Sequence, residues 1–117
     1  MFTINGKGFT PLTFSLLLLS IPSCSKNDST KQLSSPLAEA GRTTYFSNCI
    51  ACHNPNPREA GSAGPSLENS SFELLYARLM KAEYPSGYKP KRSTKIMPAM
   101  PYLEEEIKGL EAFLKEP

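Results

Sequence analysis

The pentapeptide Cys49-Ile50-Ala51-Cys52-His53 constrains this chain more than any other feature of its sequence. It places two thiols three residues apart and an imidazole directly after the second thiol. Three kinds of site use such a cysteine pair: a zinc site, a thioredoxin-like redox pair and a c-type haem attachment site. The haem site also requires the histidine, because the imidazole must reach the iron from the side on which both thiols are bound.

The rest of the sequence argues against the first two kinds of site. Zinc needs about four nitrogen, sulfur or oxygen ligands, typically two cysteine pairs or a Cys2His2 set. This chain has no second cysteine pair, and His53 is its only histidine. A thioredoxin-like pair is expected beside a strand in a βαβ pattern, and no such pattern is visible. We therefore interpret Cys49 and Cys52 as the thioether-forming residues of one covalently bound haem c, with His53 as an axial ligand of the iron.

The single histidine also limits the second axial ligand of the iron. Two histidines from one chain are excluded, so this ligand is a methionine, a weaker group or none. Met97 and Met100 each precede a proline, which restricts the residue before it to extended backbone and favours a rigid loop. The alternative is that both methionines fill the core, as we expect of Met80 within a helical pattern.

The first residues of the chain have the pattern of an export signal. Lys7 precedes an apolar run at residues 12–21, which is shorter than the ~20 residues of a transmembrane helix. The run leads into Ile21-Pro22-Ser23-Cys24, which resembles the lipobox of bacterial lipoproteins. We expect residues 1–23 to be removed and Cys24 to be acylated, which would hold the protein on the periplasmic side of a bacterial membrane. An ordinary secretory signal is the alternative.

Export explains the odd number of cysteines. An unpaired thiol in an exported protein needs a role. Here Cys24 would be acylated, and Cys49 and Cys52 would form the two thioethers, so that no free thiol remains. Residues 24–36 include the acylated cysteine and have the polar composition of a flexible tether. Residues 37–117 then form one domain of about 80 residues, a size that usually depends on disulfides, metals or cofactors. A net charge of +2 excludes the strongly basic surface of a nucleic-acid-binding protein.

Beyond the pentapeptide, the chain resembles the class I monohaem cytochromes c over about residues 37–116. Gly41 and Tyr45 lie one helical turn apart before the haem motif, as in the N-terminal helix of that family. The segment Gly64-Pro65-Ser66-Leu67 matches its Gly-Pro-x-Leu segment. The resemblance implies a small all-α fold of three to four helices wrapped around one haem. It also implies that the Pro65 carbonyl accepts a hydrogen bond from the unligated nitrogen of His53.

Two further helices are expected after the haem motif. One covers residues 70–82 and places four apolar residues on one face: Phe72, Leu75, Tyr76 and Leu79. The C-terminal helix has the acidic residues 104–106 in its first turn. Its apolar residues recur at helical spacing: Ile107, Leu110, Phe113 and Leu114. The resemblance implies that the C-terminal helix crosses the N-terminal helix near Gly41 and Tyr45.

The resemblance also distinguishes between the two methionines. In many bacterial members the ligand opens a Met-Pro-x-x-Pro-x-Leu segment that leads into an acidic helix start, which makes Met97 the axial ligand and Met100 the alternative. An iron with both axial positions filled has no open site for a substrate, so we expect an electron carrier and not an enzyme. The implied partners are redox proteins of the respiratory or periplasmic electron-transfer chain. Two alternatives stay open: a subunit of a larger reductase or oxidase complex, and a haem sensor or peroxidase whose methionine leaves the iron.

The stretch 83–94 is longer and more basic than is expected of the smallest members of the family. Four cations lie in the loop that leads to Met97: Lys89, Lys91, Arg92 and Lys95. On the family fold they would lie on or near the exposed haem edge, where they would steer an acidic redox partner. The alternative is a solvated loop in which one or two of them serve the haem propionates.

Overall fold

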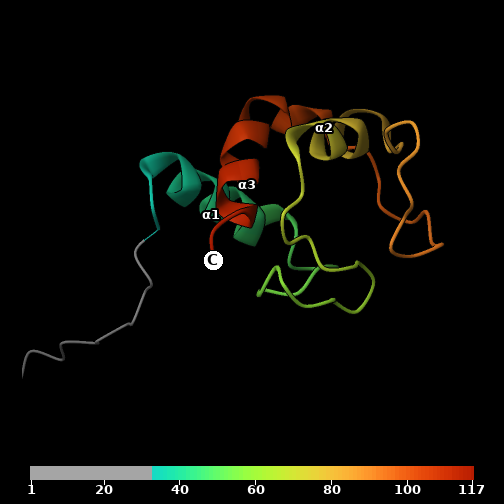
Figure 1. Cartoon of the computed structure of the whole chain (residues 1–117), viewed down its shortest axis with the longest axis horizontal. Helices are drawn as coiled ribbons and strands as arrows, with labels where there is room; N and C mark the ends of the chain where they lie inside the picture. Colours follow the sequence, from blue (N-terminus) through green and yellow to red (C-terminus); the bar gives the residue numbers. More distant parts are fainter. Residues whose placement is uncertain (1–32) are drawn as a thin grey trace, which may run out of the picture. The chain divides into compact units, whose positions relative to one another are not determined.

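The computed structural model describes residues 33–117, which form three α-helices and one 3-10 helix without any strand. In chain order these are α1 (Pro36–Asn48), α2 (Phe72–Lys81), η1 (Pro101–Glu106) and α3 (Ile107–Leu114) (Figure 1). The predicted all-α fold of three to four helices is confirmed. None of the helices in this part of the chain combines the length and apolar character needed to cross a bilayer. The predicted signal, residues 1–23, and Cys24 lie outside the described residues.

The helix α1 has a clear sequence-encoded start. The Ser35 side chain accepts a hydrogen bond from the Ala38 N–H at 3.1 Å, and Pro36 occupies the first helical position, where its missing N–H costs nothing. The helix ends at the haem motif, where the Cys49 N–H still donates to the Tyr45 carbonyl at 2.9 Å. The motif is therefore attached directly to the last turn of α1.

The helices α1 and α3 cross in close contact. A Cβ atom built on Gly41 would lie 1.8 Å from the carbonyl oxygen of Gly109, so no larger residue fits at Gly41 without moving the backbones apart. One turn further along, the Tyr45 and Phe113 rings pack with centroids 5.4 Å apart. The crossing near Gly41 and Tyr45 is thus present as the resemblance implied. Gly109 is its second glycine, and the sequence reading missed it.

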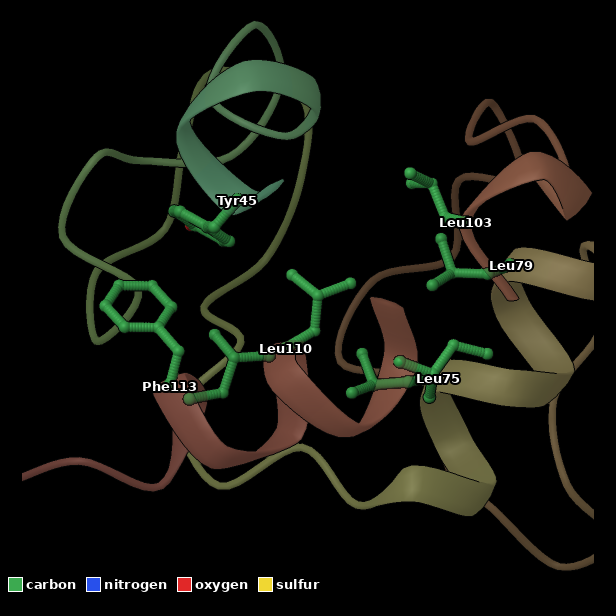
Figure 2. Close-up of a cluster of buried hydrophobic side chains, with 8 residues drawn as sticks. Tyr45, Leu75, Leu79, Leu103, Leu110 and Phe113 are labelled. Carbon is green, nitrogen blue, oxygen red and sulfur yellow. The ribbon is translucent and has the colours of Figure 1, made fainter. Parts of the chain in front are cut away.

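The core lies among the three α-helices and η1. Figure 2 shows Tyr45 of α1 beside Leu110 and Phe113 of α3, with Leu75 of α2 near them. The four apolar residues predicted for the C-terminal helix are all buried. The core consists of eight buried side chains: Tyr45, Leu75, Leu79, Leu103, Ile107, Leu110, Phe113 and Leu114.

The predicted buried face of α2 is partly wrong. Leu75 and Leu79 are buried, but Phe72 and Tyr76 are 39% and 38% exposed and stack on each other with ring centroids 6.0 Å apart. Arg78 takes the buried position instead and is only 7% exposed. Where α2 packs against η1 and α3, its buried stripe runs through Leu75, Arg78 and Leu79 and leaves out Phe72 and Tyr76.

The acidic residues 104–106 lie in η1 and not in the first turn of an α-helix. Pro101 opens η1, and the Leu103 N–H donates to the Met100 carbonyl at 3.0 Å, which is the tighter i to i+3 bond of a 3-10 turn. The α-helical part begins at Ile107.

The two ends of the described chain meet. Leu33 packs against the core, and the backbone N–H and hydroxyl of Ser34 both donate to the Glu116 carboxylate, the N–H at 3.1 Å. Residues 33–36, which we assigned to the tether, therefore contact the domain or begin α1.

Candidate haem site

One cavity of about 240 Å³ collects the predicted haem-binding residues of the described chain. Its wall is formed by the segment that follows α1, by one side of α2 and by the segment before η1. Six of its lining residues were predicted as site residues from the sequence: Cys49, Cys52, His53, Pro65, Met97 and Met100. Residues up to 51 positions apart, Cys49 and Met100, thus share one cavity.

His53 has a fixed orientation in this wall. The side chain is buried, and its Nδ1 lies 2.9 Å from the Pro65 carbonyl oxygen. The Nδ1–H donates to this acceptor, which leaves Nε2 as the ring nitrogen for a metal. Burial lowers the pKa of His53, the hydrogen bond to Pro65 opposes this, and the positive charge of Arg92 lowers it further. The imidazole is therefore neutral at neutral pH, as metal binding requires.

Gly64 provides the space for the His53 ring. A Cβ atom at Gly64 would lie 2.4 Å from both Cε1 and Nδ1 of the ring and 2.8 Å from Nε2. The Gly64 N–H donates to the Cys52 carbonyl at 2.9 Å, which holds this segment against the haem motif. The glycine of the Gly-Pro-x-Leu segment thus allows its backbone to approach the ring.

The two thiols are held by a turn that continues α1. The N–H groups of Cys52 and His53 both donate to the Cys49 carbonyl, at 3.1 and 2.9 Å. Both cysteines are free thiols, and burial raises the pKa of Cys49 to about 11, so that its thiol is uncharged. Among residues 33–117 no three His, Cys, Asp or Glu side chains come together as a metal-ion site.

Met97 and Met100 both lie partly buried against the core cluster. The Met100 N–H donates to the Leu79 carbonyl at 2.6 Å, so its backbone is fixed to α2 just before η1 begins. The Met97 carbonyl accepts a hydrogen bond from the Arg78 guanidinium at 3.4 Å. Each methionine is thus attached to α2 by a different hydrogen bond.

The sequence reading missed the cationic and aromatic part of the wall. The Arg78 guanidinium lies over the Tyr84 ring, 4.5 Å from its centroid, and the Tyr84 and Tyr88 rings stack in parallel at 5.4 Å. Lys91 and Arg92 also line the cavity, whereas none of the described Asp and Glu residues does. A possible signal was the arginine within the apolar spacing of α2, three residues after Leu75.

These features fit a c-type haem. Two free thiols, a neutral imidazole with Nε2 uncommitted, and a largely apolar wall come together at one cavity. The family model for cytochrome c matches residues 38–116.

The chain belongs to the cytochrome c family. The match covers more than half of the chain and all of the described helices except the first two residues of α1. The predicted class I cytochrome c and its covalently bound haem c are thereby confirmed, and Cys49, Cys52 and His53 form the family's Cys-x-x-Cys-His motif. A cytochrome c domain transfers electrons through its haem, and its partners are redox proteins. Comparison with curated proteins and with solved structures gives no significant match.

Proposed function

We propose that this cytochrome c is a one-electron carrier whose haem iron is held by His53 and Met97. The observation that carries the proposal is that both side chains line one cavity together with Cys49 and Cys52. When bound, the haem supplies a reversible one-electron couple. The chain attaches it through the two thioethers, orients the His53 ring through Pro65, and excludes water with apolar side chains.

The sequence supports Met97 over Met100 as the sixth ligand. Met97 opens the Met-Pro-x-x-Pro-x-Leu segment in which many bacterial family members carry their ligand. The backbone bonds of the two methionines to α2, from Met100 to Leu79 and from Arg78 to Met97, leave both thioethers available. With both axial positions filled, no position is left for a substrate, which favours electron transfer over catalysis.

Two matched variants test this ligand assignment. Methionine-ligated haem has a characteristic charge-transfer absorption band in the oxidised state, which reports the ligand directly. Met97→Ala is expected to abolish this band and Met100→Ala to retain it. The reverse outcome would reassign the ligand to Met100. Absence of the band from the wild-type protein would remove methionine from the site altogether, and a band that survives each single substitution would mean that another methionine can take the missing one's place.

We further propose that the protein is a lipoprotein anchored on the periplasmic side of a bacterial membrane. The support is in the sequence alone: an apolar run at residues 12–21 followed by Ile21-Pro22-Ser23-Cys24. Mass spectrometry of the mature protein is expected to find an acylated Cys24 at its N-terminus, and Cys24→Ser is expected to release the domain from membranes. A mature N-terminus at any other residue refutes the anchor.

The partner is proposed to be a redox protein of the respiratory or periplasmic electron-transfer chain. Stable co-purification with a reductase or oxidase would instead make the chain a subunit of that complex. Binding of carbon monoxide by the reduced wild-type protein would favour the sensor or peroxidase alternative, because such binding requires that methionine leaves the iron.

A further inference from the structure

The four cations before Met97 fall into two pairs in the structure. Lys91 and Arg92 line the cavity, whereas Lys89 and Lys95 are exposed and form no hydrogen bond or ion pair within residues 33–117. All four carry the same charge and lie within seven residues of one another. Charge alone therefore does not distinguish the roles of the two pairs, whereas their contacts do.

Lys91 and Arg92 bind a single distant segment, residues 61–66. The Lys91 ammonium donates to the Ser66 carbonyl at 2.9 Å and to the Ser66 hydroxyl at 3.2 Å. The Arg92 guanidinium donates to the carbonyl oxygens of Gly61 at 3.1 Å and Ser62 at 3.4 Å. Both cations thus donate their hydrogen bonds to uncharged backbone and hydroxyl oxygens about 25 to 31 residues away in sequence.

The receiving segment is the one that orients His53. Its Pro65 carbonyl accepts from the His53 ring, and its Ala63 and Gly64 N–H groups both donate to the Cys52 carbonyl. Any group bound to residues 61–66 is consequently bound to the histidine side of the cavity.

The donating segment has few other attachments. From residue 89 to residue 99 no backbone group forms a hydrogen bond with another backbone group of the described chain. Besides the hydrogen bonds of Lys91 and Arg92, this segment is held by the bond from Arg78 to the Met97 carbonyl. A segment with so few hydrogen bonds would open readily, yet Met97 must stay at the iron in both redox states.

We propose that Lys91 and Arg92 form a latch that ties residues 89–99 to residues 61–66 and thereby keeps Met97 at the cavity. Lys91 and Arg92 are positioning residues that act on Met97. The exposed Lys89 and Lys95 are the cations that contact a docking partner. The inference rests on the proposed ligation by His53 and Met97. It also predicts an electrostatic effect, because a fixed positive charge beside the axial histidine disfavours the additional positive charge of the oxidised iron.

The matched pair Arg92→Gln and Lys95→Gln tests the latch, because both remove one positive charge from the same segment. In the oxidised protein, imidazole competes with methionine for the iron, so its affinity measures how easily Met97 leaves. We expect Arg92→Gln to bind imidazole about tenfold more tightly than wild type, as the loss of hydrogen bonds from a charged, partly exposed group implies. Its reduction potential should fall as well. Lys95→Gln should match wild type in imidazole affinity.

Two more variants complete the test. Lys91→Gln should also raise imidazole affinity, and since Lys91 is exposed it provides a second measurement if Arg92→Gln does not fold. Met97→Ala should bind imidazole more tightly than any latch variant. If Met97→Ala binds imidazole like wild type, the ligand assignment fails. If Met97→Ala opens the site but Arg92→Gln and Lys91→Gln behave like Lys95→Gln, the latch is wrong and the ligand assignment stands.

Discussion

Replacing Gly41 with alanine perturbs the crossing of α1 and α3 at its closest point. The added Cβ would lie 1.8 Å from the carbonyl oxygen and 2.2 Å from the carbonyl carbon of Gly109. It would also lie 2.7 Å from the Leu110 backbone nitrogen. All three atoms belong to the backbone of a helix, so no side-chain rotation relieves the clash.

The size of the effect follows from these distances. An ordinary contact begins near 3.4 Å, so the helices would have to separate by about 1.6 Å along this direction. Such overpacking typically costs about 1–3 kcal/mol and sometimes more. The better helix propensity of alanine returns about 1 kcal/mol. Because the clash is with helix backbone, its cost lies near the upper end of that range, and the separation also weakens the contact between the Tyr45 and Phe113 rings by about 0.5–1 kcal/mol. We therefore expect a net loss of about 2–3 kcal/mol from the free energy of unfolding.

Urea unfolding of the haem-loaded protein measures this loss, and Gly109→Ala is its control. A Cβ at Gly109 would lie 3.1 Å from the Gly41 nitrogen and 3.2 Å from the Leu37 carbonyl oxygen, which requires a shift of only a few tenths of an ångström. That cost is close to the gain in helix propensity, so Gly109→Ala should be within about 1 kcal/mol of wild type. Equal losses for the two variants would refute the reasoning.

Two other residues give predictions of the same kind. Gly64→Ala should displace the His53 ring and break its hydrogen bond to Pro65, so that less haem is covalently attached per chain, as measured by pyridine haemochrome absorbance. Tyr45→Phe should cost about 1 kcal/mol in urea unfolding, because the Tyr45 hydroxyl donates to the Asn54 carbonyl at 2.6 Å, whereas Tyr76→Phe should cost nothing measurable. Burial, with a smaller contribution from Cys49, raises the pKa of Tyr45 from 10.0 to about 12. Between about pH 10 and 12 the phenol is therefore ionised in the unfolded chain but still protonated in the folded one. The stability contributed by the protonated phenol is fully present below about pH 10 and is lost over this window by about 1.4 kcal/mol per pH unit. Tyr45→Phe should lose less stability over the same range.

The helices and the site motif could be predicted because their signals are local. The spacing of apolar residues predicted the buried stripe of α3, and the pentapeptide predicted the haem motif. Ser35 and Pro36, which begin α1, are an equally local signal, but we assigned them to the tether. The prediction that Met97 lies at the same site as Cys49 and His53 came from the family resemblance, because no local pattern relates residues that far apart in sequence. The three residues line one cavity in the structure.

The parts that were missed depend on contacts between distant segments. Phe72 and Leu75 are equally apolar, and only the position of η1 and α3 decides which of them faces the core. Arginine is rarely buried in proteins, so its residue type gave no reason to expect Arg78 in a buried position. Its partners in the structure are an aromatic ring and carbonyl groups. The partners of Lys91 and Arg92 are mainly backbone carbonyls, which have no sequence signature.

The meeting of Ser34 with Glu116 also bears on how such a domain can be built into larger proteins. Domain ends that lie side by side allow a domain to be inserted into a surface loop of a host protein, since both connections leave from one point. They equally allow circular permutation, in which a short linker joins the old ends and new ends are opened in an exposed turn such as the one around Gly87. Because α1 and α3 hold the two ends together, either rearrangement would leave the helix crossing intact. The haem domain is therefore a module that can be moved between proteins as one unit.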